Sequence, residues 1–345
     1  MTKNLYKIII SFVLLFAFSV NNNIYGQGCM ESESEDGVTV VGYLQPQYQY
    51  IQSETGDENY FSFNRARLGV VGNIPYDFSY YAIIDFSNFK TDAGLLLDGF
   101  ITYKRFKNLK MSLGQFKSPV SLEQNTPCQA LHTIERSKVV NELAGPDRDI
   151  GFMIFGGDDS TLFKYSLAIT NDYKRNVKDE NNQKSIKGRV VVQPLDFLKF
   201  GGSFSYGITG PLEDNTKTRY GAELQLKFSN FLVQAEYLMA DDTGDYTTGG
   251  GCDGTPIEFH TGGVSRSGYF VQAMYMTSFN FQPVIKFESY DADTSIDDNN
   301  ITTITFGANY FVNDWTRIQL NYMYKAEAPI EVRNDVIALQ LQVKF

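Results

Sequence analysis

The feature that most constrains this chain is a strict alternation of long and short connections between segments with a two-residue hydrophobic repeat. From Val38 onward, apolar and polar residues alternate as they do in strands with two different faces, and the pattern defines sixteen segments. The connections between them are by turns 8 to 31 and 2 to 6 residues long. We therefore predict an all-β fold in which every tight turn lies at one end. The predicted strands are 38–50, 59–72, 77–86, 95–104, 109–117, 149–155, 162–170, 185–193, 198–206, 219–228, 231–240, 266–276, 281–290, 302–311, 316–324 and 336–345.

The two faces of these segments differ in chemistry. In segment 162–170, Phe163, Tyr165 and Leu167 share one face, whereas Lys164 and Ser166 share the other. A dry core cannot bury unpaired charge, so the polar face needs water and the apolar face can contact lipid. A transmembrane antiparallel β-barrel of about sixteen strands, with short periplasmic turns and long external loops, meets both needs. The alternative, a soluble β-sandwich or surface adhesin, would require the apolar faces to pack on each other.

The first residues have the composition of a secretory signal peptide. Lys3 and Lys7 precede the apolar stretch 8–20, and a polar segment follows up to Gly26, where we expect cleavage. The apolar stretch is shorter than the roughly 20 residues that a spanning helix needs. We therefore expect three parts: a signal peptide at 1–26, a flexible acidic segment at 27–37 and an outer-membrane β-barrel at 38–345.

Aromatic residues and the last segment favour the outer membrane of a Gram-negative cell. Several of the 27 Phe and 22 Tyr lie beside short connections, as does Trp315, which is typical of an interfacial aromatic girdle. The terminal Phe345 resembles the signal read by the barrel assembly machinery, so we expect that machinery and outer-membrane lipid as partners. The net charge of -10 provides no bulk positive field, which excludes nucleic acid as a partner.

The predicted inner face is basic although the chain is acidic. Parity places fourteen Lys and Arg side chains inward against six Asp and Glu. Rings of Lys and Arg favour anions in a pore, so the pattern predicts passive diffusion of small anions through a basic lumen. If the inward charges only solvate the lumen and pair with one another, the alternative is a non-selective general porin. The predicted pore-lining strand residues at mid-height are Arg65, Arg67, Lys187, Arg189 and Lys286, and the predicted periplasmic basic track is Lys104, Lys110, Lys164, Lys199, Lys227 and Arg317.

The connection at about 118–148 is too long for a plain link in a compact fold. Its apolar residues can pack against a wall of the barrel, and its middle carries Arg136 and Lys138. We expect it to fold inward and constrict the pore, with Arg136 binding anions there. The alternative is an external flap.

Four short motifs resemble the phosphate-selective porin O and P family. They are FNRARLG at 63–69, GQFKSP at 114–119, IERS at 134–137 and RDIG at 148–151. The resemblance covers nearly the whole predicted barrel. It implies a sixteen-stranded barrel in a homotrimer, an inward-folded third loop, and phosphate or polyphosphate as the anions carried.

The same resemblance assigns individual residues. Arg65 and Arg67 match the paired basic positions of the family's second strand, Arg136 matches the arginine of the third loop, and Lys187 and Arg189 match a strand start. The middle of the loop offers only Arg136 and Lys138, fewer arginines than the ladder that strict phosphate selectivity needs. The resemblance thus implies anion preference more firmly than phosphate specificity.

An enzyme built on the barrel, such as a barrel hydrolase, is a remote alternative. His132, His260 and Ser265 all lie in predicted loops, and neither a Gly-x-Ser-x-Gly nor a His-Glu-x-x-His motif occurs. We expect no cofactor and no metal, because the histidines and cysteines lack ligand spacing. Cys128 and Cys252 are predicted on the external side, where a disulfide between them is a hypothesis.

Overall fold

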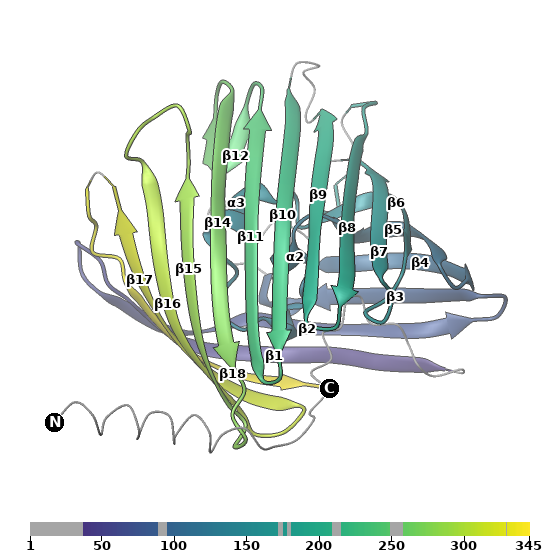
Figure 1. The fold of residues 1–345 in the computed structure, drawn as a ribbon, viewed down its shortest axis with the longest axis horizontal. Coiled ribbons are helices and arrows are strands. Elements are labelled where there is room, and N and C mark those ends of the chain that lie inside the picture. The colour runs from purple at the N-terminus through teal and green to yellow at the C-terminus, as the bar shows by residue number, and fades with distance from the viewer. Residues whose placement is uncertain are drawn as a thin grey trace.

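The barrel is closed and antiparallel in the computed structural model, which describes residues 37–88, 95–171, 175–177, 181–208, 215–248, 258–328 and 330–345 (Figure 1). Each barrel strand pairs with the next barrel strand along the chain, and β1 pairs with β18 to close the ring. The predicted all-β barrel of sixteen strands is confirmed. The barrel strands are β1 (Val38–Ile51), β2 (Glu58–Ile74), β3 (Phe78–Asp85), β4 (Leu96–Phe106), β5 (Leu109–Lys117), β6 (Arg148–Gly156), β7 (Phe163–Thr170), β8 (Ser185–Leu195), β9 (Leu198–Ile208), β10 (Thr216–Phe228), β11 (Phe231–Asp242), β14 (Val264–Tyr275), β15 (Phe281–Asp291), β16 (Asn300–Phe311), β17 (Thr316–Glu327) and β18 (Val336–Lys344).

Two sets of connections join these strands, one at each end of the barrel. The short turns, 75–77, 107–108, 157–162, 196–197, 229–230, 276–280 and 312–315, all lie at one end, which we call the short-turn end. The other end carries the long loops, including the 3-10 helix η1 (Phe86–Asn88) and a hairpin of β12 (Tyr246–Thr248) and β13 (Glu258–His260). The predicted signal peptide, the acidic segment up to residue 36 and Cys252 lie outside the described residues. Within the described part of the chain, no helix has the length and hydropathy to cross a membrane.

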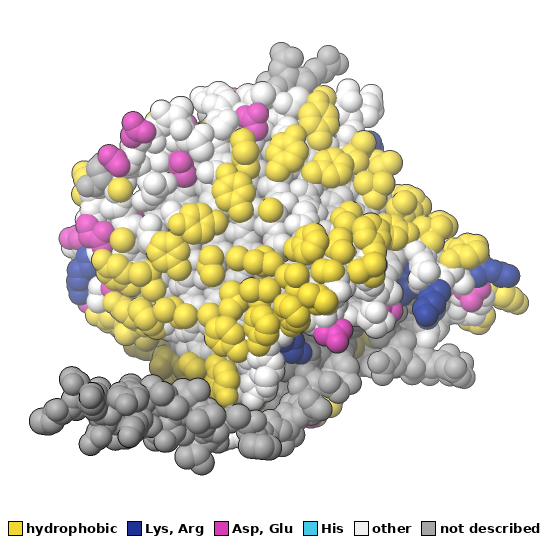
Figure 2. Space-filling view, viewed as in Figure 1, with side chains coloured by type: hydrophobic (Ala, Val, Ile, Leu, Met, Phe, Trp, Pro, Cys, Tyr) yellow, Lys and Arg dark blue, Asp and Glu magenta, His cyan; other side chains and the backbone are white. Residues whose placement is uncertain are grey.

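The outer surface is apolar because the two-residue repeat places alternate side chains on it. Tyr220 and Leu224 of β10 are exposed, whereas Arg219 and Glu223, each one residue earlier, are buried inside. Figure 2 shows hydrophobic side chains spread in a broad band over the visible face of the barrel. Such a surface is the one expected against hydrocarbon chains.

Aromatic side chains gather on the outside at the short-turn end. Tyr76 and Trp315 are exposed in two of the turns, and the rings of Phe197 and Phe228 stack 5.1 Å apart between two neighbouring turns. Aromatic residues at this height are typical of a membrane interface.

The C-terminal residue completes the closure of the barrel. The backbone of Phe345 exchanges two hydrogen bonds of 2.9 Å with Gly42 of β1. A β-carbon at Gly42 would lie 2.8 Å from the Phe345 ring, so glycine is what lets this ring lie against β1. The terminal residue thus contributes to the seam between the first and last strands.

The long connection between β5 and β6 lies inside the barrel, against its inner wall. It contains α2 (Leu122–Asn125), the 3-10 helix η2 (Cys128–Ala130) and α3 (Lys138–Leu143), and most of its side chains are buried. Val139, Val140 and Leu143 of α3 pack against Leu238 of β11 and Phe270 of β14. We call residues 118–147 the inner loop. The inner faces of β11, β14 and β15 thus contain an apolar surface that seats this loop.

Candidate functional site

The inner wall carries the predicted cations, and ion pairs hold several of them below the water-accessible surface. Arg67 Nε lies 2.7 Å from Asp85 Oδ2, with both side chains buried. Lys187 Nζ lies 2.8 Å from Asp149 Oδ2, and each of these side chains is 1 % exposed. Pairs this deep are screened far less by salt than surface pairs, because little water reaches them.

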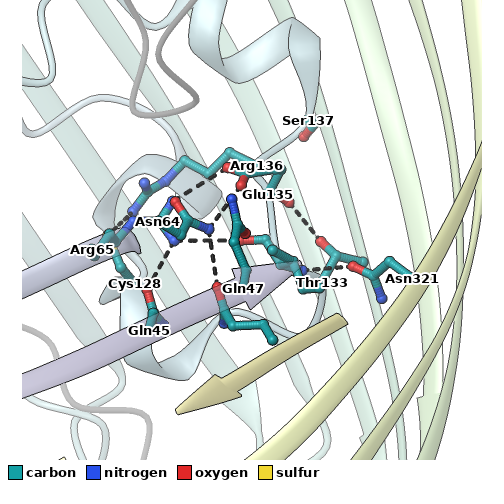
Figure 3. Close-up of polar contacts among 12 residues, drawn as sticks. Gln45, Gln47, Asn64, Arg65, Cys128, Thr133, Glu135, Arg136, Ser137 and Asn321 are labelled. Atoms are coloured by element: carbon teal, nitrogen blue, oxygen red, sulfur yellow. Dashed lines mark hydrogen bonds and ion pairs between the residues drawn. The ribbon is translucent and has the colours of Figure 1, made fainter. Parts of the chain in front are cut away.

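Arg65 joins β2 to the inner loop. Its guanidinium lies 3.4 Å from Glu135 Oε2 and donates to the backbone carbonyl of Ile134 and to Gln45. Asn64 donates to Glu135 Oε1 at 2.8 Å from the same strand (Figure 3). The paired basic motif of β2 therefore faces inward beneath the loop, where Arg65 is 1 % exposed.

Arg136 turns toward the end of α2. Its Nε and Nη2 donate to the carbonyls of Glu123 and Thr126 at 3.1 and 2.9 Å. Lys117, which sequence reasoning did not select, donates to the carbonyls of Gln124 and Thr126 at 3.0 and 3.1 Å. Because a helix end leaves carbonyl groups without intrahelical partners, both cations satisfy the C-terminal end of α2.

Lys138, the second cation of the loop, has a different environment. It lies 3.3 Å from Glu142, one turn along α3, and its ammonium lies over the ring of Tyr290. Its side chain is partly exposed, in contrast to the buried Arg136.

Two buried carboxylates anchor the ends of the loop helices. Glu236 of β11 accepts from the backbone N–H groups of Leu122 and Glu123 and from the hydroxyl of Ser121. Glu123 accepts from the backbone and hydroxyl of Ser137, and it lies 3.2 Å from Lys286 Nζ. A carboxylate at a helix N-terminus satisfies donors that have no intrahelical partner. Glu236 is an acidic residue on a face predicted to be aqueous, so sequence reasoning gave no sign of this role.

A row of polar side chains on β15 to β18 binds the backbone of the loop. Arg317 donates to the carbonyl of Leu131 at 2.8 Å, Asn309 to that of His132 at 2.8 Å, and Asn321 accepts from the N–H of Ile134 at 2.7 Å. Arg317 was predicted with the basic track, but it is buried because the loop covers this part of the wall. These contacts fix the loop along its middle third.

His132 lies within this row and is hydrogen-bonded to Gln282. Burial lowers the pKa of His132 to about 4, against an opposing effect of that hydrogen bond. The imidazole is therefore neutral at pH 7 and suited to a loop that is packed against the wall.

The exit of the loop carries a second acidic and basic cluster that the sequence pattern did not reveal. Arg148 lies 3.2 Å from Asp98 and 2.8 Å from Asp147. Burial raises the pKa of Asp147, but the neighbouring Arg148 guanidinium outweighs it and holds that pKa at about 2. Both ends of the loop are thus tied to the wall by charged groups.

The remaining predicted cations form an uncovered group at the short-turn end. Lys104 donates to Asn73, the ammonium of Lys110 lies over the ring of Phe155, and Lys227 is exposed. Lys164 and Lys199 both lie near Asp159 of the turn between β6 and β7. We call these five lysines the open track. They come from β4 to β10. The start of the inner loop contacts β9 at Ser203, whereas the middle of the loop lies against β15 to β18 and β2.

Arg189 stands between the two groups. It pairs with Glu223 of β10 at 2.6 Å, and its side chain retains partial exposure. The site therefore contains buried, paired cations that hold a loop and accessible cations that an anion in the lumen can meet. Its chemistry is that of charge and hydrogen bonding.

Cys128 lies in the inner loop. Its sulfur is 3.1 Å from Arg67 Nη1 and 3.4 Å from Arg136 Nη2, and it packs with Tyr43 and Leu131. The hypothetical disulfide to Cys252 involves a residue outside the described part of the chain.

Comparisons with known proteins identify the sequence family. The sequence profile of the family described as phosphate-selective porin O and P matches residues 43–211 and 205–345. No curated protein sequence matches the chain.

Several solved structures share the fold at low sequence identity. An anion-selective porin from Comamonas acidovorans has a TM-score of 0.64 and 11 % identity, over 90 % of this chain and 99 % of that one. OmpF of Salmonella typhi has a TM-score of 0.67 and 12 % identity, over 89 % and 97 %. The outer membrane channel DcaP of Acinetobacter baumannii has a TM-score of 0.61 and 13 % identity, over 92 % and 99 %. At these identities the likeness concerns the fold.

Proposed function

Because the chain belongs to the phosphate-selective porin O and P family and is an outer-membrane porin, we propose that it conducts small anions by passive diffusion. The family and the barrel indicate a channel rather than an enzyme. The anions proposed are small and hydrated, with phosphate or polyphosphate as the candidates suggested by the family's description.

The observation that carries this proposal is the open track. Its five lysines face the lumen at one end, and three of them, Lys164, Lys199 and Lys227, lie on β7, β9 and β10 within the same part of the wall. Two unit charges 4 Å apart interact by about 4 kcal/mol at an effective dielectric of 20 and about 1 kcal/mol in water, so accessible cations in a narrowed lumen favour anions. Several moderate sites let an ion move on, whereas one deep site would trap it.

We propose that the predicted pore-lining residues contribute in two ways. Arg65, Arg136 and Lys286 position the inner loop, which narrows the lumen from one side. Arg67 and Lys187 lie in buried ion pairs, whereas the side chain of Arg189 remains partly exposed in its pair with Glu223. We therefore propose that anions make direct contact with Arg189 and with the open track.

A non-selective general porin is the second candidate, and the buried pairs favour it. Cations paired with carboxylates contribute little net field to the lumen, which leaves the open track to supply the preference. Strict phosphate selectivity would need several accessible arginines, whereas Arg136 is buried and Arg189 is only partly exposed.

Reversal potentials of the purified protein in planar bilayers test the proposal. Under a potassium chloride gradient we expect a potential of the sign that anion permeation produces, and a smaller value in concentrated salt because the Debye length is about 10 Å at 0.1 M and about 3 Å at 1 M. Adding phosphate to a chloride solution should reduce the chloride current if phosphate shares the track. A potential of the cation-selective sign would contradict the proposal.

We further propose assembly as a homotrimer in the outer membrane, after cleavage of the signal peptide and with barrel assembly machinery acting on the last strand. Support for the last step is that Phe345 closes the seam with Gly42. Deleting Phe345 should lower the amount of heat-modifiable barrel recovered from outer membranes severalfold. Phe345→Tyr, which keeps the aromatic ring and the backbone bonds, is the control. Equal recovery of the deletion and the control would contradict this role.

A further inference from the structure

Asp159 is a carboxylate among the cations of the open track. It belongs to the turn between β6 and β7, and its Oδ1 lies 3.3 Å from Lys199 Nζ and 3.6 Å from Lys164 Nζ. Lys199 is on β9 and Lys164 is on β7. The same carboxylate oxygen therefore lies near two ammonium groups from strands that are separated by β8. Arg189 on the intervening β8 also interacts electrostatically with Asp159.

Hydrogen bonds between the residues on either side of Asp159 hold the turn in shape. The Asp158 carboxylate accepts from the N–H and the hydroxyl of Ser160 at 2.8 and 2.6 Å, and Thr161 Oγ1 accepts from the Asp158 N–H at 2.9 Å. Gly157 begins the turn with φ +77, and a β-carbon there would lie 2.2 Å from the carbonyl oxygen of Phe163. Because the neighbouring residues close the turn, the Asp159 side chain is available to the lysines.

These two contacts are far more accessible to water than the buried ion pairs of the inner wall. Asp159 is 56 % exposed, with Lys164 at 41 % and Lys199 at 27 %, whereas the pair of Lys187 and Asp149 is 1 % exposed on both sides. Exposed ion pairs contribute about 0 to 1 kcal/mol, so the carboxylate can leave the lysines when another anion arrives.

We propose that Asp159 is a resident competitor for permeant anions at the short-turn end of the pore. Its carboxylate oxygen occupies the position between Lys164 and Lys199 where an oxygen of inorganic phosphate would make the same two contacts. An anion passes by exchanging with the carboxylate, which then returns and displaces it. Asp159 thereby keeps the lysine pair attractive to anions without letting it become a trap. This inference rests on the proposed anion conduction.

Phosphate block of the chloride current tests the inference in single-channel recordings of the whole protein. Asp159→Asn should lower the phosphate concentration that halves the chloride current severalfold when phosphate is added at the short-turn end, because the two lysines then face no competing carboxylate. Asp159→Glu, which keeps the charge, should remain within about twofold of the wild type. Adding Lys164→Met and Lys199→Met to the Asp159→Asn variant should abolish the gain.

Asp77→Asn is the matched control. Asp77 lies in another turn of the same end and pairs at 3.7 Å with the exposed Arg105. Its φ is +67, a backbone conformation that Asn tolerates well. This control removes the same charge at the same height without touching the lysine pair, so it should leave the phosphate block unchanged.

The outcomes separate this inference from the function on which it rests. Equal phosphate block in Asp159→Asn and Asp77→Asn would overturn the competitor role while leaving a wild-type anion preference intact. A cation-selective wild-type reversal potential would overturn the proposed function itself. A gain in Asp159→Asn that survives removal of both lysines would also overturn the inference, because the site would then lie elsewhere.

Discussion

Lys286 and Lys164 face the same lumen from strands with the same alternation, yet they have different environments. Lys286 lies 3.2 Å from Glu123 of the inner loop, and both side chains are 3 % exposed. Lys164 lies 3.6 Å from Asp159 in a turn, where water reaches both partners. The difference arises because the inner loop covers β15, whereas in the described structure Lys164 of β7 remains accessible to solvent.

The comparison shows that an inward cation in this barrel has one of two roles. A covered cation pairs with a carboxylate or a carbonyl of the loop, so its removal should lower the stability of the folded protein. An accessible cation contributes its charge to the lumen, so its removal should change the ion selectivity of the channel. The same substitution at the two positions should therefore separate stability from selectivity.

The largest effect is expected from Lys286→Met. This change leaves the buried Glu123 carboxylate without its ammonium partner, a loss that costs about 3 to 5 kcal/mol for a buried pair. The unfolding midpoint, followed by heat-modifiable migration on gels, should fall, and channel currents should become noisier as the loop loosens. Lys164→Met, the same change at an exposed pair, should cost less than about 1 kcal/mol. Equal midpoints for the two variants would contradict the covered role of Lys286.

A smaller effect on stability but a clear one on selectivity is expected from charge reversal in the open track. Lys164→Glu combined with Lys227→Glu should shift the reversal potential in a salt gradient toward cations, because two accessible positive charges become negative in a narrowed lumen. Asp241→Lys, a charge reversal on an exposed residue at the long-loop end of β11, is the control and should shift the potential far less. If the control shifts it as much, selectivity is set outside the track.

The smallest effect is expected at acid pH, where protonation of His132 weakens the docking of the inner loop against the barrel wall. The folded pKa of His132 is about 4, below its ordinary value of 6.5, so a detached loop binds a proton at His132 more readily than a docked one. Docking is therefore fully stable above about pH 6.5 and loses stability as the pH falls toward 4. Current noise should rise over this interval, and His132→Gln should flatten the His132 contribution. An unchanged pH profile in His132→Gln would show that protonation of His132 does not make loop docking depend on pH.

Much of the barrel could be predicted from the sequence because strand alternation is local. All sixteen predicted segments are strands, and the segment 109–117 has the bounds of β5 itself. The inward direction of Arg65, Lys187 and Lys286 follows from the same parity. The sequence also contained one sign of where the inner loop is seated: Leu238 and Ala240 continue an inner face that holds Gln234 and Glu236, and they pack with α3.

The accessibility of each cation could not be predicted in this way. Arg317 was predicted with the track and lies under the loop, whereas Lys117, Arg148 and Glu236 were not selected and hold the loop or its ends. Each of these contacts joins residues that are distant in sequence or depends on the conformation of the loop. No periodic signal marks such a pair.

The sequence by itself determined which residues form strands, and which side of each strand meets lipid and which meets the lumen. These properties depend on local spacing over about two to ten residues, because successive side chains of a pleated strand point to opposite faces. Only the tertiary structure decided which inward charges are paired and which reach water. That outcome depends on how one loop, buried through Val139, Val140 and Leu143, lies across strands far from it in the chain, and desolvation then separates cations of identical sequence pattern.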